Sequence, residues 1–354
     1  MKDKIITFSF IGYILFFGIF HFVLTDKEIS ISERRKLTTF PELELTSDYI
    51  TKVDKYLLDH FPFRDEFRSL KANFNYKILN KLDNNDIYLK DNYIFKSEYP
   101  TDDKSISKFK EKVNKLMSLL SSNNETYIMI VPDKNYYLED YDFLQLDYDY
   151  IYGKINELNL TEIDIRNLME LDDYYETDTH WKQEKLDKVI KKMSEVMDFD
   201  YEIQEYKENK YNKFYGVYYG ESAISREPET LTYLTNDDIN NVSVKYLENK
   251  ELTKIYNLEK LESLDSYEVY LDGASSFIEI ENANSRSNKE LIIFRDSFGS
   301  SITPLLVKYY AKITLVDNRY INSDTFKNLI EFKDQDVLFL YSTLIVNNGS
   351  SLKG

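Results

Sequence analysis

The stretch ELIIFRDSFGSSITPLL (Glu290–Leu306) decides the fold class. Its first five residues form a short apolar run, which is typical of a buried parallel strand. The polar turn Arg295–Gly299 follows this run, and a helical segment then continues through Ala311. A strand, a turn and a helix in this order predict one repeat of a parallel sheet that is covered by helices.

Further apolar runs extend this alternation along the chain. We expect strands at Thr126–Val131, Lys312–Asp317 and Asp336–Tyr341, helices at Ser105–Leu120, Trp181–Met197 and Thr325–Phe332, and a strand-turn-strand unit at Asn85–Phe95. Between residues 199 and 288 the pattern changes to short alternating stretches, which indicate a β-rich insertion. The sequence therefore predicts an α/β domain over residues 85–354, with a parallel sheet flanked by helices.

The N-terminal segment reads as a membrane span. Ile5–Leu24 carries no formal charge over about twenty residues, which is roughly the length that crosses a bilayer core. Lys2 and Lys4 precede it, so we expect the N-terminus inside and the bulk of the chain extracytoplasmic. A cleaved signal peptide is the alternative, but no small-x-small site follows the segment. We favour a single-pass signal anchor at residues 1–25, followed by a stalk and a helical region at residues 26–84.

Composition excludes several functional classes. The chain has 354 residues, 42% of them apolar and 30% charged, a globular balance. The net charge of −17, without a cluster of Lys and Arg, argues against nucleic acid as a partner. There is no cysteine, hence no disulfide and no thiolate metal site. Scattered carboxylates and one available histidine do not provide metal-ligand spacing, so we expect neither a metal nor a cofactor.

Ser297 is the first candidate for chemistry. It lies in a turn between a predicted strand and a helix, at the edge of a parallel sheet where ligands gather. The N-terminus of a helix can supply N–H groups to a developing oxyanion. The hydroxyl would still need a general base. The alternative is an ordinary helix cap, because Asp, Ser and Gly are common at helix starts.

His180 is the natural candidate for that base. The chain has three histidines, of which His21 lies in the membrane segment and His60 in the DHFPFRD turn. In an extended segment, residues two apart project to the same side, so Asp178 is expected to lie beside His180. The carboxylate would then fix the imidazole tautomer. The alternative is again capping, with Asp178 or Thr179 starting a helix.

Several motifs together resemble the DHHW family of bacterial envelope proteins, which is similar to the SGNH-like alginate O-acetylation proteins. They are DTHW (Asp178–Trp181), FRDSFGSSITPLL (Phe294–Leu306), the preceding YEVYLDG stretch, and the N-terminal SERRKLTTFPEL and DHFPFRDEFRSLK. The resemblance covers nearly the whole chain. It implies an SGNH-hydrolase-like domain in which an Asp-x-His pair and a later Ser transfer or remove acetyl groups on an exopolysaccharide.

Carried over, the resemblance makes Ser297 the nucleophile, His180 the base and Asp178 the residue that orients it. The chain departs from the family pattern at Thr179, where the name motif has His, and at Arg295, where a small residue is usual. Arg295 would crowd the turn or pair with substrate. The remaining candidates for substrate contact are Trp181, which would wall the site, and Arg319 and Tyr320 after the third strand, for which a structural salt bridge is the alternative.

The leading hypothesis is a serine-dependent O-acetyltransferase or acetylesterase that acts on a cell-envelope or secreted polysaccharide. The resemblance further implies a membrane-bound O-acyltransferase partner that supplies acetyl groups across the bilayer. The alternative is a non-catalytic glycan-binding or assembly protein that keeps the same scaffold.

Overall fold

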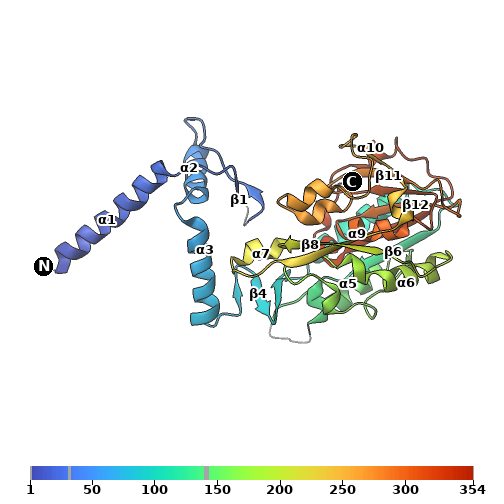
Figure 1. Ribbon diagram of the computed structural model, residues 1–354, viewed down its shortest axis with the longest axis horizontal. Helices are drawn as coiled ribbons and strands as arrows, with labels where there is room; N and C mark the ends of the chain where they lie inside the picture. The colour runs from blue at the N-terminus through green and yellow to red at the C-terminus, as the bar shows by residue number, and fades with distance from the viewer. Residues whose placement is uncertain (1, 31–32, 139–142, 354) are drawn as a thin grey trace. The chain divides into compact units, whose positions relative to one another are not determined.

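The computed structural model describes residues 2–30, 33–138 and 143–353. Small parts of the predicted anchor, stalk and main domain, at positions 1, 31–32, 139–142 and 354, therefore lie outside the described residues. The chain divides into two compact units (Figure 1). Unit 1 comprises Met1–Asn85 and Tyr219–Arg226, and unit 2 comprises Asp86–Tyr218 and Glu227–Gly354.

Unit 2 is built on a sheet that has seven strands among the described residues, in the order β10-β11-β13-β12-β14-β6-β7. Its parallel strands are β6 (Thr126–Val131), β7 (Thr161–Glu162), β12 (Glu290–Arg295), β13 (Lys312–Val316) and β14 (Asp336–Ser342). Because β12 pairs with both β13 and β14, the carboxyl ends of these three strands meet at one edge. The expected α/β architecture, a mostly parallel sheet flanked by helices, is confirmed.

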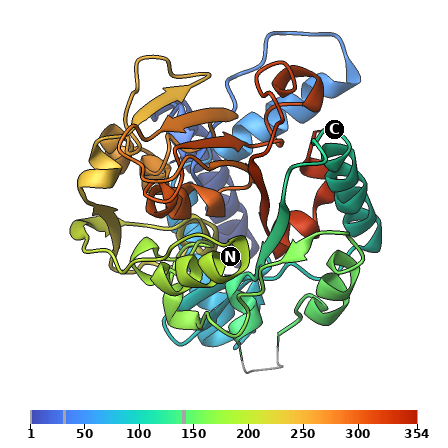
Figure 2. The same ribbon diagram turned by 90° about the vertical axis from the view of Figure 1, so that its right-hand side faces the viewer.

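Helices cover both faces of the sheet because alternate strand residues point to opposite sides. Leu291 and Ile293 contribute to one buried core, while Ile292 and Phe294 contribute to the other. The first face carries α6 (Asp187–Met197) and α9 (Phe298–Leu306); the second carries α4 (Asp103–Met117), α5 (Tyr148–Ile155), α10 (Ser323–Phe326) and α11 (Thr343–Val346). Figure 2 shows α4 and α9 on opposite sides of the central strands.

The predicted β-rich insertion is partly continuous with this sheet. β11 (Phe277–Glu281) pairs antiparallel with β13, and β10 (Ser243–Tyr246) pairs antiparallel with β11. Outside the sheet, β8 (Lys207–Phe214) and β9 (Glu229–Thr235) form a separate antiparallel pair, and the predicted strand-turn-strand unit is the hairpin of β4 (Ile87–Lys90) and β5 (Tyr93–Lys96). The short helices of this region are α7 (Val217–Ser222) and α8 (Asp237–Asn240).

Unit 1 contains the apolar N-terminal helix, the predicted stalk and the helical region that follows it. Its elements are α1 (Lys2–Val23), α2 (Ser47–Asp59), α3 (Arg64–Asn73), the π-helical turn Phe74–Ile78, β1 (Ile29–Ser30), β2 (Arg35–Lys36) and β3 (Asp83–Asn84). The predicted stalk folds back on α2, since the carboxylate of Asp59 accepts two hydrogen bonds from Arg35 and two from Thr38. His60 also bonds the carbonyl of Thr38 at 2.8 Å.

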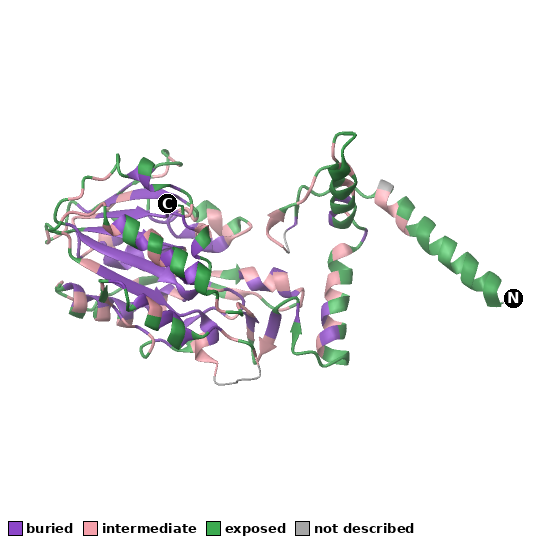
Figure 3. Ribbon diagram, turned by 180° about the vertical axis from the view of Figure 1, so that it is seen from behind, coloured by how far each residue is buried: buried purple, intermediate pink, exposed green. Residues whose placement is uncertain are grey.

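α1 is long and apolar enough to cross a membrane by length and composition, and none of that span is buried. Figure 3 shows it exposed over nearly its whole length.

Two predicted helices have different limits in the structure. The helix predicted from Trp181 begins at Asp187, because the side chain of Gln183 bonds Ser301 and Leu234 and holds the intervening segment in a short 3-10 turn. The helix predicted at Thr325–Phe332 is the shorter α10, which Asn322 caps.

Candidate active site

Ser297 occupies the turn between β12 and α9, at the carboxyl edge of the sheet. Ser297 is the N-cap residue of α9, yet its hydroxyl accepts no hydrogen bond from the N–H groups of the first helical turn. The capping is done by Asp296, whose carboxylate accepts from the backbone N–H of Phe298 at 2.9 Å and from that of Ser342 at 2.7 Å. The hydroxyl of Ser297 therefore does not cap the helix, contrary to the alternative interpretation of this serine.

The hydroxyl of Ser297 instead contacts His180, with 2.7 Å between Oγ and Nε2. On the other side of the ring, Nδ1 lies 2.6 Å from a carboxylate oxygen of Asp178. Since an ionised carboxylate only accepts, the proton resides on Nδ1 and Nε2 accepts from the serine. The three side chains thus form one hydrogen-bonded chain from carboxylate to hydroxyl. The alternative that Asp178 caps a helix is excluded, because the next helical turn begins at Gln183, with Lys182 at its N-cap position.

The buried carboxylate of Asp178 is well supplied with donors. One oxygen also accepts from the backbone N–H of His180 at 3.1 Å, and the other accepts from the N–H of Val217 at 2.8 Å. A buried ionised carboxylate needs such donors to offset its desolvation. The arrangement stabilises a charged Asp178 beside the imidazole.

Two charged residues hold the segment that carries Asp178. Lys134 is almost fully buried, and its ammonium donates to the backbone carbonyls of Tyr175, Glu176 and Asp178 at 2.7–3.1 Å. The carboxylate of Glu229 accepts from the N–H groups of Glu176 and Thr177 at 2.6 and 2.7 Å. Neither side chain reaches the reacting atoms, so both act by positioning.

Gly216 approaches the same segment too closely for any side chain. A Cβ atom at this position would lie 2.2 Å from the carbonyl of Thr177, which is a prohibitive overlap. Its N–H donates to the hydroxyl of Thr177 at 2.8 Å and is therefore engaged.

Aromatic rings fix the plane of the imidazole. The ring of Tyr267 stacks on His180, with 3.8 Å between centroids and 7° between planes. Burial raises the pKa of Tyr267 well above its usual value, so its phenol is neutral and donates to Ser301 at 2.8 Å. Trp181 donates to the same hydroxyl at 2.9 Å and is fully buried. This burial leaves the indole no surface on which to contact a substrate in this conformation.

Arg295 and Arg319 both face Asp317. Arg295 is fully buried under the turn and donates to Ser300 at 2.8 Å and to the carbonyl of Ser275 at 3.2 Å. Arg319 makes a bidentate contact with Asp317 at 2.6 and 2.9 Å, and Arg295 lies 3.7 Å from the same carboxylate. Burial lowers the pKa of Arg295, and the charge of Asp317 opposes that shift.

The predicted substrate-contact residues thus differ in their access to solvent. Arg295 has no exposed surface, and its contacts are those of a structural residue. The bidentate pair of Arg319 with Asp317 matches the structural salt bridge that was its alternative. Tyr320 is exposed at the same edge of the sheet, where the strand β13 ends.

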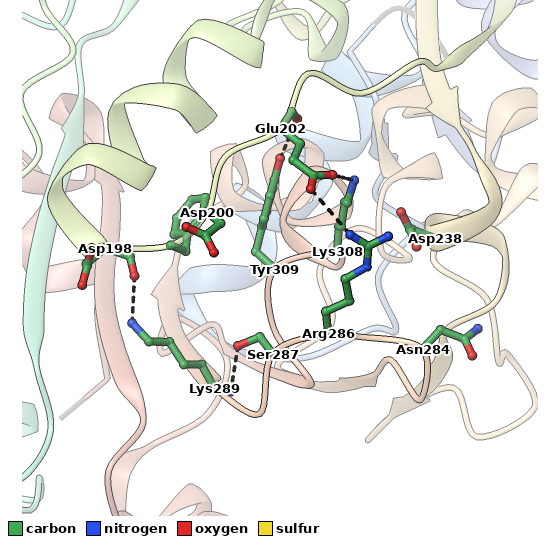
Figure 4. Close-up of a pocket in the computed structure, with 11 residues that line it drawn as sticks. Asp198, Asp200, Glu202, Asp238, Asn284, Arg286, Ser287, Lys289, Lys308 and Tyr309 are labelled. Carbon is green, nitrogen blue, oxygen red and sulfur yellow. Dashed lines mark hydrogen bonds and ion pairs between the residues drawn. The ribbon is translucent and has the colours of Figure 1, made fainter.

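A separate cavity of about 650 Å³ lies at the opposite edge of the sheet (Figure 4). It is lined by residues that follow α6, precede β12 and follow α9, together with Asp238 of α8. Its central carboxylate, Glu202, is paired with Lys308 at 2.6 Å and with Arg286 at 3.6 Å. Among the described residues, no three His, Cys, Asp or Glu side chains gather closely enough to hold a metal ion.

Residues 97–316 match the family model described as DHHW protein. The matched region covers more than half of the chain and includes Asp178, His180 and Ser297. The chain belongs to the DHHW family. The resemblance noted from the motifs is therefore confirmed. No curated protein matches the sequence.

Solved structures of similar fold include a DHHW family protein from Eubacterium siraeum. It is 20% identical, with a TM-score of 0.64, and the match covers 76% of this chain and 94% of that chain. Bacillus cereus PatB1, solved with a sulfonyl adduct, is 18% identical with a TM-score of 0.60, covering 76% and 97%. The O-acetyltransferase domain of Pseudomonas putida AlgJ also matches, at 13% identity and a TM-score of 0.44, covering 74% and 92%.

Three positioning residues escaped sequence reasoning. Lys134 follows a recognised strand, but its sequence position does not indicate that it binds a segment some forty residues later. Glu229 is one of many acidic residues, and Tyr267 is one of 31 tyrosines. The sequence around Gly216 likewise does not indicate that this residue lies against Thr177.

Proposed function

We propose that this DHHW protein is a serine-dependent O-acyltransferase or esterase that acts on polysaccharide outside the membrane. The observation that carries the proposal is the hydrogen-bonded chain from Asp178 through His180 to Ser297, with contacts of 2.6 and 2.7 Å. This arrangement activates a hydroxyl as a nucleophile, because the base lies within hydrogen-bond reach and a carboxylate orients it.

In the first half-reaction, Oγ of Ser297 attacks the carbonyl carbon of an acetyl donor while its proton moves to Nε2 of His180. The tetrahedral intermediate then collapses, and the leaving alcohol departs with the proton from His180. An acetyl group is now bonded to Ser297. Asp178 stabilises the imidazolium that forms in between and does not itself take the proton.

In the second half-reaction, a sugar hydroxyl attacks the acetyl group and gives its proton to His180. The bond between acetyl and Ser297 breaks, and the serine regains its proton from Nε2. Water in place of the sugar gives hydrolysis by the same steps. Acceptor access therefore decides between transfer and hydrolysis.

The oxyanion needs N–H donors, and the start of α9 is the place to seek one. The backbone N–H of Ser297 donates to no residue within the described part of the chain. We assign it as one oxyanion donor, since the N–H groups at a helix start are oriented toward such a charge. Tyr320, exposed at the same edge, is the assigned contact for the sugar.

The location of the reaction follows from α1. We propose that α1 anchors the chain as a single membrane span, with both units outside, because Lys2 and Lys4 precede the apolar stretch. The partner that we propose is a membrane-bound O-acyltransferase that supplies acetyl groups across the bilayer, as the resemblance to the DHHW family implies.

The test is turnover of a chromogenic acetyl ester by the full chain in detergent. We expect release of the chromophore by the wild type and a loss of about 10³-fold or more in Ser297→Ala and His180→Ala. Ser118→Ala, at an exposed serine after α4, should match the wild type. Added polysaccharide should divert acetyl from water to sugar if the protein is a transferase.

Equal rates for the wild type and Ser297→Ala would refute the proposed nucleophile. Complete inactivity of a folded wild type that nevertheless binds polysaccharide would favour the non-catalytic glycan-binding role instead.

A further inference from the structure

Unit 1 exposes a stripe of apolar side chains along α3. Phe63, Phe67, Leu70 and Phe74 follow the spacing of one helix face. Their exposed fractions are 42, 41, 64 and 50%. Exposed side chains of this size and number on one face mark an interaction surface rather than an ordinary solvated helix.

The N-terminal part of the stripe contacts α1. The ring of Phe63 lies 5.7 Å from that of Phe20, and the ring of Phe67 lies 5.9 Å from that of Phe17. Phe61, in the turn before α3, stacks on Phe17 at 5.2 Å. The turn and the first half of α3 therefore lie level with the last two turns of α1.

The length of α1 decides what surrounds those two turns. The helix has 22 residues, which at about 1.5 Å per residue span about 33 Å. A hydrocarbon core is about 30 Å thick, so a crossing uses the whole helix. Phe17 and Phe20 precede Val23 by six and three residues, which places them about 9 and 4.5 Å before its end. Side chains that touch them are therefore at the depth of the outer membrane boundary.

Three arginines near the stripe share the carboxylate of Glu33. Arg64 contacts the carboxylate of Glu33 at 2.8 Å, and Arg68 lies 3.6 Å from it. Arg35 reaches the same carboxylate at 3.0 Å. A guanidinium group that is paired with a carboxylate costs less free energy to bring to a membrane surface than an unpaired guanidinium group.

We infer that the turn at Phe61 and the stripe on α3 insert into the outer leaflet of the membrane. The inference concerns membrane contact rather than chemistry, and it rests only on the proposed crossing by α1. Unit 1 then lies in the interface as an amphipathic helix does, with its aromatic side buried at the boundary of headgroups and acyl chains.

The test uses the absence of cysteine from the chain. Single variants Phe63→Cys, Phe67→Cys and Leu70→Cys of the full chain carry a nitroxide label in lipid nanodiscs. Phe8→Cys, inside α1, gives the membrane reference, and Ile203→Cys, 83% exposed in unit 2, gives the aqueous reference. Electron paramagnetic resonance then compares collisions of each label with oxygen, which concentrates in lipid, and with a nickel chelate, which stays in water.

We expect the oxygen-to-nickel ratio at positions 63, 67 and 70 to exceed that at position 203 and to approach that at position 8. Ratios equal to that at position 203, with a lipid-like ratio at position 8, would overturn the insertion while leaving the crossing intact. Low collision with both reagents would mean that a protein covers the stripe, which also refutes lipid contact. An aqueous ratio at position 8 would refute the crossing and the inference together, but not the chemistry.

Discussion

At the scale of single residues, Lys134 is a buried side chain that supports the site without touching the reacting atoms. Its buried ammonium satisfies three backbone carbonyls of the segment that carries Asp178. Rings of Tyr93, Phe95 and Tyr218 lie 5.1–5.8 Å from the same ammonium. The position of the carboxylate, and through it the orientation of His180, therefore depends on a residue far away in sequence.

Replacing this residue should damage activity and stability together. We expect Lys134→Met to remove three hydrogen bonds to backbone carbonyls, although the carbonyl of Glu176 keeps another donor, the N–H of Ile94. The free energy of unfolding should fall by about 3 kcal/mol. The turnover number should fall more than the affinity for the ester, because the base is misplaced while the ester-binding surface is retained. Thermal unfolding and steady-state kinetics measure both effects.

Lys185→Met is the matched control, since this lysine makes a partly exposed ion pair with Asp172. This substitution should change neither the free energy of unfolding nor the turnover number by much. A wild-type turnover number in a folded Lys134→Met protein would contradict the positioning role.

The residues nearest the chemistry were the easiest to predict from the sequence. Only a few residues of the chain could form a catalytic triad: one available histidine, an acid two residues before it, and a serine that follows a strand. The structure brings these three residues together. The supporting residues were not predictable, because a contact such as that of Tyr267 with His180 depends on the folded path of the insertion.

At the scale of elements, the segment that follows His180 shows why the limits of helices were predicted less well than the strands. The composition after Trp181 suits a helix. However, a bridge between Trp181 and Tyr174 and the contacts of the buried Gln183 allow only a short 3-10 turn before Asp187. Tertiary contacts thus override local propensity. The strands were predicted better, since apolar runs flanked by polar turns leave few alternatives.

The close contact of Gly216 with the segment that carries Asp178 gives a test at the same scale. We expect Gly216→Ala to push the segment that carries Asp178 and to lower the turnover number by up to about 10²-fold. Gly153→Ala is the control, because no atom lies within 4 Å of its added Cβ. In its helix, that change should preserve activity and stabilise slightly. Unchanged kinetics in Gly216→Ala would show that the segment yields without consequence.

At the scale of the whole molecule, the two units are stabilised in different ways. Unit 2 buries apolar side chains on both faces of its sheet, whereas the contacts of the stalk with α2 in unit 1 are largely ionic. Hydrogen bonds from Arg35 lower the pKa of Asp59 well below its usual value of about 4. Unit 1 should accordingly be the more sensitive of the two to acid.

The sign of this effect follows from proton linkage. In the unfolded chain Asp59 takes up its proton near pH 4, and in the folded chain only at lower pH. The ion pair thus stabilises unit 1 fully above about pH 4. This stabilisation is lost as the pH falls below the pKa of Asp59 in the unfolded chain and toward its lower pKa in the folded chain. We expect thermal unfolding to show a steeper loss of stability below pH 4 in the wild type than in Asp59→Asn.

Asp48→Asn, at an exposed position in α2, controls for the loss of one charge and should follow the wild type. Parallel pH profiles for the wild type and Asp59→Asn would contradict the assignment of the lowered pKa to this pair.

The central claim is that Ser297 is a nucleophile activated by His180, and covalent labelling tests it most directly. Sulfonyl fluorides react with activated hydroxyls, and a protein of the same fold was solved with a sulfonyl adduct. The full chain would be treated with such a reagent and followed by intact mass and peptide mapping. The proposed mechanism predicts one adduct, located on Ser297, absent from Ser297→Ala and formed far more slowly in His180→Ala. A folded wild type with no adduct, or with its adduct on another residue, would contradict it.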